Sequence, residues 1–194
     1  MLMTATSHRG TGDDTLMERV AQRDGAAFRS LIEAYRDRPY RIAWRMLGDA
    51  AEAEDVAQEA LLRLWSHAGE WRPGGPGVAA WLARVATNLC LDRLRRRRFT
   101  GDDEVPEQVD ESPLADATMD EETMRTKTMT AIQSLPERQR AAIVLTYYEE
   151  QGNAAAAEML EMNIKAFESL LLRARQALRA ALARQGLISM GDVM

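Results

Sequence analysis

The sequence predicts an all-α protein made of two small helical domains joined by a flexible acidic linker. Apolar residues make up 46% of the chain and lean towards Ala, Leu and Met, which favour helices, while aromatic residues make up only 6%. No run alternates apolar and polar residues in the way that half-buried strands do. Residues 100–121 contain two prolines, many carboxylates and no helical stripe, which is typical of a linker. The predicted units are therefore a domain at 13–99, the linker at 100–121 and a domain at 122–187.

The charge is unevenly distributed along the chain. The net charge of −5 comes from one acidic segment, and the rest of the chain is mildly basic. Residues 102–122 contain ten acidic and no basic side chains, whereas the remainder carries 25 basic against 20 acidic residues. Directly before this acidic stretch stands "LDRLRRRR", which is a strong electrostatic signal for phosphate. An acidic total therefore does not exclude binding to nucleic acid.

Local signals define the helices of the first domain. Asp13, Asp14 and Thr15 are predicted to cap a short helix over 16–23. A helical pattern follows from residue 26 to Gly48, which is a C-terminal stop, and Pro39 should bend or break it.

Two further helices complete this domain. Asp49 and Glu52 form a capping box for a helix over 50–68. Three glycines and two prolines make residues 71–77 a loop, and residues 78–98 form one long helix after it.

The second domain has a helix-turn-helix pattern. A helix is predicted near 122–134, and another begins at Pro136 in its first turn. A short Ala-rich helix follows, and Asn163 then caps a long last helix. Its buried seam is predicted to consist of Ile164, Phe167, Leu171, Ala174, Leu178 and Leu182.

One face of the helix at 50–68 is acidic. It carries Glu52, Asp55 and Glu59 with Leu62 at helical spacing. Spacing alone leaves two interpretations open: a solvated face, or a docking surface for a basic partner with Leu62 as its apolar anchor. Paired carboxylates also occur in metal and acid–base sites, but the only histidines are His8 and His67, which disfavours that chemistry.

Two other helices carry candidate nucleic-acid contacts. On the helix at 78–98, Arg84, Asn88 and Arg95 form a polar row that suits phosphates and base edges, although a solvated face is the alternative. The last helix carries a second set directed away from the seam, in which Glu and Ser can read base edges and Arg can meet phosphates. This second set consists of Lys165, Glu168, Ser169, Leu172, Arg173 and Gln176, and the arginines that can meet phosphates are Arg173 and Arg175.

Several classes of protein are disfavoured by what the sequence lacks. A single cysteine, Cys90, excludes an internal disulfide framework and fits a reducing compartment. The first 12 residues lack the apolar core of a signal peptide, and no apolar run is long enough to span a bilayer. We therefore expect a cytoplasmic protein that is not integral to a membrane, with no catalytic residues, no metal, no cofactor and no small-molecule substrate.

Four stretches occur in order along the chain: "GDAAEAEDVAQEALLRLW", "WLARVATNLCLDRLRRRR", "LPERQRAAIVLTYYE" and "IKAFESLLLRARQALRAAL". With the acidic linker between the second and third, they resemble a group IV, extracytoplasmic-function (ECF) sigma factor of bacterial RNA polymerase. The resemblance covers residues 14–187. It implies a region 2 helical bundle, a region 4 helix-turn-helix domain, and partners that comprise core polymerase, promoter DNA and a cognate anti-sigma factor.

The resemblance also implies roles for individual residues. The acidic helix matches region 2.2, so that Glu52, Asp55, Gln58, Glu59 and Leu62 would dock on the clamp helices of the polymerase β′ subunit, while the β flap is a further contact of the polymerase. The loop at 71–78 and the helix after it match regions 2.3 and 2.4, which capture a flipped base of the melted −10 element. The residues implied there are Trp71, Arg72, Arg84, Asn88, Arg95, Arg96 and Arg97. The last helix would read the duplex −35 element through Lys165, Glu168, Ser169, Leu172, Arg173 and Arg175.

Two alternatives remain open from the sequence. A stand-alone helix-turn-helix regulator would bind duplex DNA without polymerase and would not need the acidic face at Glu52, Asp55 and Glu59. A helical enzyme is a weaker alternative, because catalytic His and Cys residues and Gly-rich phosphate loops are missing.

Overall fold

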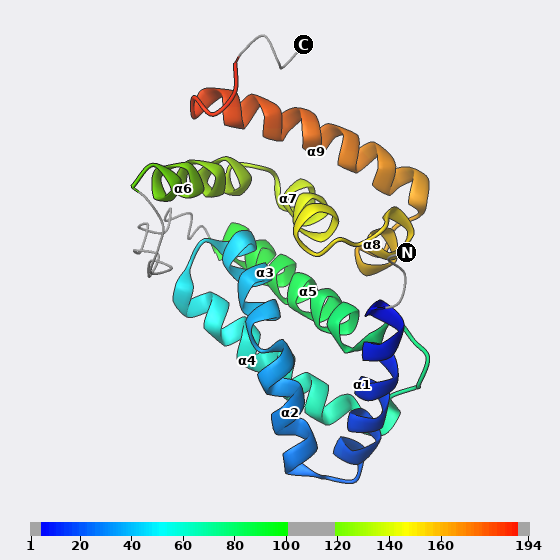
Figure 1. The fold of residues 1–194 in the computed structure, drawn as a ribbon. Coiled ribbons are helices and arrows are strands. Elements are labelled where there is room, and N and C mark those ends of the chain that lie inside the picture. Colours follow the sequence, from blue (N-terminus) through cyan, green and yellow to red (C-terminus); the bar gives the residue numbers. More distant parts are fainter. Residues whose placement is uncertain (1–4, 101–118, 190–194) are drawn as a thin grey trace.

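The computed structural model describes residues 5–100 and 119–189, and within these ranges every regular element is helical (Figure 1). The N-terminal unit comprises α1 (Ala5–Ala21), α2 (Gly25–Tyr35), α3 (Asp37–Leu47), α4 (Ala50–His67), the 3-10 turn η1 (Ala68–Glu70) and α5 (Gly77–Thr100). The C-terminal unit comprises α6 (Met119–Gln133), α7 (Glu137–Ile143), the π-helical turn η2 (Val144–Tyr148), α8 (Asn153–Met159) and α9 (Ile164–Arg184). The all-α prediction is confirmed. Residues 101–118, which form most of the predicted acidic linker, lie outside the described residues.

Helix α3 lies at the centre of the N-terminal unit and packs against both α4 and α5. Its apolar face buries Ile42, Ala43 and Met46 completely. Leu64 of α4 and Leu82 of α5 are equally inaccessible and belong to the same core. Burial of each such side chain contributes roughly 1.5–3 kcal/mol, so the packing of these three helices holds α4 and α5 in a fixed relation.

The predicted boundary between the helices at 26–48 and 50–68 is confirmed. Gly48 has the left-handed φ of 74° and ends α3, and the side chain of Asp49 accepts the N–H of Glu52 at 2.8 Å to begin α4. A Cβ on Gly48 would come within 2.5 Å of the end of the flexible Gln133 side chain of α6, which would have to move aside, so it is the positive φ that requires glycine here. The break expected near Pro39 falls just before it, between Tyr35 and Asp37, because proline is tolerated in the first turn of α3.

The predicted start of the first helix is wrong. Helix α1 begins at Ala5, so Asp13, Asp14 and Thr15 lie inside it and do not cap it. The two carboxylates bind other segments of the chain instead: Asp13 accepts the hydroxyl of Tyr35 at 2.5 Å, and Asp14 accepts hydrogen bonds from the loop after η1. Adjacent carboxylates that serve long-range contacts are indistinguishable in sequence from a capping group.

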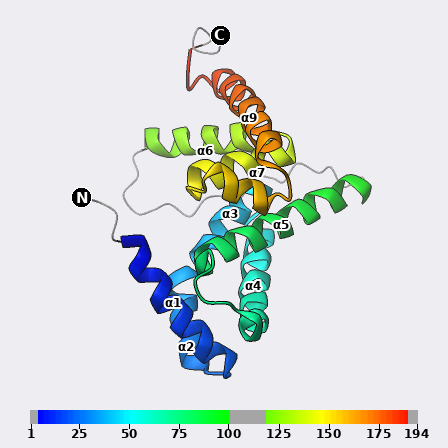
Figure 2. The ribbon, with the colours of Figure 1, turned by 90° about the vertical axis from the view of Figure 1, so that its right-hand side faces the viewer.

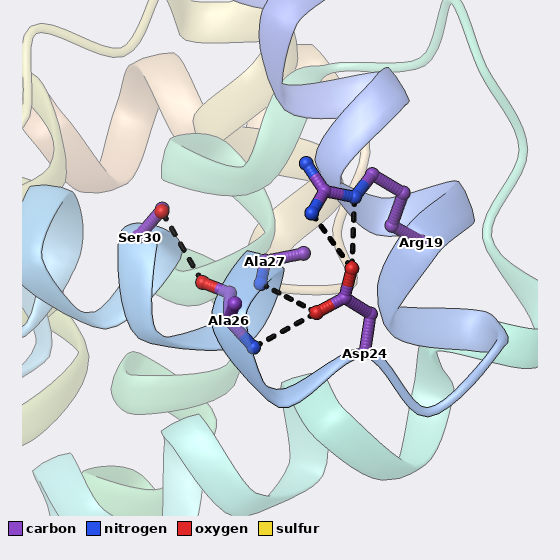
Figure 3. Close-up of polar contacts among 5 residues, drawn as sticks. All are labelled: Arg19, Asp24, Ala26, Ala27 and Ser30. Atoms are coloured by element: carbon purple, nitrogen blue, oxygen red, sulfur yellow. Dashed lines mark hydrogen bonds and ion pairs between the residues drawn. The ribbon is translucent and has the colours of Figure 1, made fainter.

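The cap of α2 is instead formed by Asp24, which also joins α2 to α1 (Figure 3). One carboxylate oxygen accepts the N–H groups of Ala26 and Ala27 at 2.9 and 3.2 Å. The other accepts two guanidinium nitrogens of Arg19 at 2.9 and 2.7 Å. The hydrogen bonds from Arg19, followed by those from the helix N-terminus, hold the pKa of Asp24 below its ordinary value of 3.8.

We expect Asp24→Ala to lower the Tm at neutral pH, and the difference from wild type to shrink in acid. A carboxyl whose folded pKa is depressed contributes stability above its ordinary pKa, and this contribution is lost as the pH falls through the folded pKa. Circular dichroism melts of both proteins from about pH 7 to about pH 2 test this, because other carboxyls titrate equally in both. A difference that stays constant down to the lowest pH would contradict the assigned cap.

The C-terminal unit contains the predicted helix-turn-helix. Helix α8 ends at Met159, a turn follows in which Glu161 has the left-handed φ of 54°, and the Asn163 side chain accepts the N–H of Ala166 at 2.9 Å to cap α9. Most of the predicted seam of α9 is buried or half-buried, and Phe167 is the largest fully buried side chain. Ile164 is the exception, because it stands in the first turn and remains 46% exposed.

The two units pack against each other through α3, α5, α6 and α7 (Figure 2). Arg38 of α3 forms an ion pair at 2.5 Å with Glu149, whose side chain is 4% exposed. Arg140 of α7 is also buried and donates to the carbonyl of Met46 at the end of α3. The guanidinium of Arg45 lies 4.2 Å above the ring of Tyr148. Polar groups therefore make a large part of the contact between the units.

Candidate nucleic-acid interface

The acidic face of α4 lies beside the arginines of α5. Arg97 forms an ion pair with Glu52 at 2.7 Å, and both side chains are largely covered. Arg93 lies between Asp55 and Glu59, at 3.9 and 3.8 Å. The α4 carboxylates, predicted to bind polymerase, and the arginines at the end of α5, predicted to bind DNA, therefore lie together along one groove.

Solvent exposure divides the predicted docking residues into two groups. Asp55, Gln58 and Leu62 follow one stripe of α4 and are exposed; the side chain of Asp55 is 67% exposed and Leu62 is 64% exposed. Glu52 and Glu59 lie nearer α5, and Glu59 also accepts from Arg63 at 2.6 Å. The surface available to a partner is therefore the stripe of Asp55, Gln58 and Leu62, which we call the α4 stripe.

The arginines at the end of α5 divide in a similar way. Arg95 pairs with Asp92 at 2.7 Å but keeps most of its side chain exposed, and Arg96 is exposed as well. Arg97 is directed to Glu52 instead, and only a quarter of its side chain is accessible. Arg98 reaches the C-terminal unit and pairs with Glu137 at 3.0 Å. Of Arg95, Arg96 and Arg97, the first two are therefore the predicted phosphate contacts that face solvent, and Arg98 also remains 65% exposed despite its ion pair.

An open cavity of about 720 Å³ lies between the end of α4, the loop of residues 71–77 and the start of α5. His67 and Trp81 stack in its wall, with ring centroids 5.3 Å apart and planes inclined by 17°. Trp71 and Arg72 also line it. A concave site with aromatic walls and a nearby guanidinium suits a planar base that has left its stack. We call this the aromatic cavity.

Arg84 and Asn88, which were predicted to act with this loop, lie further along α5. Asn88 is half-buried about two turns after Trp81 and is not among the described residues that line the aromatic cavity. Arg84 is exposed on the same helix and lies 3.8 Å from Glu158 of α8. The structure therefore brings Trp71 and Arg72 together but places Asn88 elsewhere on the helix.

The predicted reading residues of α9 lie on its outer face. Glu168, Ser169, Leu172 and Arg173 are exposed, and the Ser169 hydroxyl donates to the Lys165 carbonyl at 3.0 Å within the helix. Leu172 is 56% exposed, although its neighbour Leu171 is buried. Lys165 is also exposed, and Arg175 lies 5.7 Å above the ring of Tyr147.

Sequence reasoning missed three participants in these surfaces. From the sequence, His67 is considered only as a metal or acid–base group, and Trp81 is not singled out. Asp14 had been taken for a cap. A signal for the first two was available, because an aromatic residue on each side of a Gly- and Pro-rich loop is a pattern that can enclose a flat ligand.

Other chemistry finds little support in the described part of the chain. No group of three or more His, Cys, Asp or Glu residues there is arranged to hold a metal. Burial raises the pKa of the Cys90 thiol to about 12, so this thiol stays protonated and unreactive. A search of the described helices for a bilayer-spanning segment finds none.

Comparison with known proteins agrees with this arrangement of two helical units. The Sigma-70 region 2 family matches residues 31–100, and the Sigma-70, region 4 family matches residues 125–178. The chain is 30% identical over 177 residues to the ECF RNA polymerase sigma factor SigW of Bacillus subtilis, across 86% of this chain and 94% of SigW. It is 32% identical over 181 residues to the RNA polymerase sigma-H factor of Pseudomonas aeruginosa, across 88% and 93% of the two chains.

Solved structures show the same fold. CnrH, in complex with the cytosolic domain of CnrY, superposes with a TM-score of 0.67 over 89% of this chain and 98% of CnrH, at 23% identity. Both sequence families occur in this chain in order, and the match covers nearly the whole length of SigW and of the sigma-H factor. The chain therefore belongs to the ECF sigma factors, which are not enzymes and which direct RNA polymerase to promoters.

Proposed function

We propose that the work of this sigma factor is divided among three surfaces of its two domains, at 13–99 and 122–187. The α4 stripe binds the clamp helices of the polymerase β′ subunit. The aromatic cavity and the exposed arginines of α5 hold the melted −10 element, and the outer face of α9 reads the −35 duplex.

The observation that carries this proposal is the position of the aromatic cavity, which lies at the N-terminal end of α5, the helix whose C-terminal end carries the arginines. Stacking of an unpaired base on an aromatic ring contributes about 1–3 kcal/mol, which offsets the few kcal/mol needed to unstack that base from DNA. Arg72 lines the cavity, and Arg95 and Arg96 are exposed on the helix that leads from it. Arg72 would hold a phosphate next to the captured base, whereas Arg95 and Arg96, roughly 20 Å further along α5, would hold phosphates several nucleotides away.

The pairing of Glu52 with Arg97 refines the proposed docking surface. Glu52 and Glu59 pair with α5 and are 32% and 40% exposed, whereas the Asp55 side chain is 67% exposed although it also lies 3.9 Å from Arg93. We therefore propose that Glu52 and Glu59 fix the orientation of α5 relative to α4, and that Asp55, Gln58 and Leu62 make the direct contacts. An exposed leucine between polar neighbours is a suitable anchor for a protein partner.

We also propose that a cognate anti-sigma factor binds this chain and that it works in the cytoplasm. CnrH has been solved with the cytosolic domain of CnrY, and RpoE of Bartonella quintana with the anti-sigma factor NepR. Such a partner would compete for the α4 stripe. Membership in the ECF family also disfavours the stand-alone regulator, which would not use this surface.

Transcription in vitro with purified core polymerase and genomic DNA tests the proposal. We expect start sites that share −35 and −10 sequences only when this protein is added. Duplex binding without polymerase-dependent starts would instead support the stand-alone regulator.

Arg173→Ala should weaken binding to the −35 duplex by about tenfold, because an arginine on the outer face of a recognition helix contributes roughly 1–3 kcal/mol. Fluorescence anisotropy with a −35 duplex measures this loss. Arg179→Ala is the matched control, since Arg179 is exposed on the same helix but lies beyond the proposed reading residues. Equal effects of the two substitutions would remove Arg173 from the interface.

A further inference from the structure

We infer that Asp14 is a positioning residue that holds the loop of residues 71–77 in the shape needed for base capture; this rests on the proposed function of the aromatic cavity. Both oxygens of its carboxylate are engaged by the loop. Oδ1 accepts the indole N–H of Trp71 at 2.8 Å, and Oδ2 accepts the backbone N–H of Gly74 at 2.9 Å. Asp14 thereby fixes one wall of the cavity and the backbone of the loop together.

The loop needs an external support because its own sequence provides little. It contains three glycines and two prolines, and Gly74 and Gly77 have φ values of 79° and 83°, which other residues rarely adopt. Glycine loses more conformational freedom on ordering than any other residue, so a free loop of this composition would populate many shapes. A loop that is already ordered loses less freedom when a ligand binds, and affinity rises accordingly.

Asp14 is well placed to provide this support. It lies on α1, which is anchored by the buried side chains of Met17 and Val20. A carboxylate that accepts two hydrogen bonds binds its donors more strongly than a neutral acceptor would. Helix α1 precedes the residues that match Sigma-70 region 2, which begin at residue 31, so this contact joins the loop to a part of the chain outside that match.

A role in base capture and a role in stability alone predict different results. If Asp14 only stabilised the N-terminal unit, its removal would weaken every activity of that unit equally. If Asp14 positions the loop, its removal should weaken chiefly the contribution of the unpaired base. The quantity to measure is therefore an affinity ratio of the holoenzyme. It is the affinity for fork-junction DNA that carries the flipped base, divided by the affinity for the same DNA with an abasic site in place of that base.

We expect this ratio to be about tenfold for the wild type, since stacking of one base on an aromatic ring contributes this much or more. Asp14→Ala should reduce it to about twofold or less, with little change in core polymerase binding. Asp13→Asn is the control: it removes a carboxylate from the adjacent position, retains an oxygen that can accept from Tyr35, and should leave the ratio unchanged. Trp71→Phe keeps a ring but removes the indole N–H, so it should lower the ratio to a value between those of the wild type and Asp14→Ala. The double variant Asp14→Ala/Trp71→Phe should have nearly the same ratio as Asp14→Ala alone.

The outcomes separate the two hypotheses. A wild-type ratio near one would refute base capture by the aromatic cavity itself. A wild-type ratio well above one that Asp14→Ala leaves unchanged would overturn the role of Asp14 alone, as would a loss of core binding and Tm in parallel with the ratio. If Asp14→Ala does not fold, Trp71→Phe decides the question. An unchanged affinity ratio in that variant would likewise overturn the proposed role of Asp14 in positioning the loop.

Discussion

The variant Asp55→Arg/Leu62→Arg should lose binding to core RNA polymerase and lower transcription by at least about 100-fold, which corresponds to nearly 3 kcal/mol. Both residues stand on the α4 stripe with roughly two thirds of each side chain exposed. Reversal of a charge in a complementary interface introduces repulsion, and a charged group at an apolar anchor must be buried without a partner. The two effects act about two turns apart on one helix.

Pull-down with core polymerase and run-off transcription measure this loss. The control variant Ser30→Arg/Glu33→Arg makes the same total change of charge on the exposed side of α2 and should bind normally. Retained −35 duplex binding would show that the test variant is folded in its C-terminal unit. Wild-type transcription by Asp55→Arg/Leu62→Arg would refute the assignment of the α4 stripe.

Arg140→Met should lower the free energy of unfolding by about 3 kcal/mol and the Tm by roughly 6–12 °C for a chain of this size. Arg140 is only 9% exposed, and burial lowers the pKa of its guanidinium. It donates to the carbonyls of Met46 and Gln133 and, at 3.2 Å, to that of Leu135. Methionine fills a similar volume but leaves these buried acceptors without their donor.

Urea unfolding followed by circular dichroism gives the change in free energy. Arg138→Met is the matched control, because Arg138 lies on the same helix and donates to the Leu160 carbonyl at 2.8 Å, but is exposed to solvent. Water can replace an exposed donor, so we expect the control to cost less than about 1 kcal/mol. Similar losses in both variants would show that burial of Arg140 is not what makes it important.

The sequence predicted those parts of the fold that depend on neighbouring residues. Gly48 ends a helix because its own backbone can adopt positive φ, and Asp49 and Asn163 cap helices because their side chains reach N–H groups two or three residues away. The alternation of buried Leu171 and exposed Leu172 follows from helical period alone. Such signals need no knowledge of the rest of the molecule.

The features that were missed depend on residues far apart in the chain. Asp14 resembles a cap until the loop at 71–77 is placed beside α1. Arg97 resembles a phosphate contact until Glu52 is found next to it, and the burial of Arg140 requires the second unit. Ile164 fits the helical period of the seam but lies in the first turn of α9, where it stays 46% exposed. Periodicity identifies the face of a helix but does not identify what lies against that face.

The ion pair between Arg38 and Glu149 has a consequence for how readily the two units can part. An apolar contact that separates in water loses its whole stabilisation, whereas separated charges regain their hydration, and this recovers much of the energy that their burial had cost. Arg84 with Glu158 and Arg98 with Glu137 add two more exposed ion pairs between the units along α5. Once parted, each face would present these charges to water together with apolar residues of the core that the two units share. The ion pairs between the units therefore oppose their separation less than apolar contacts of the same area would.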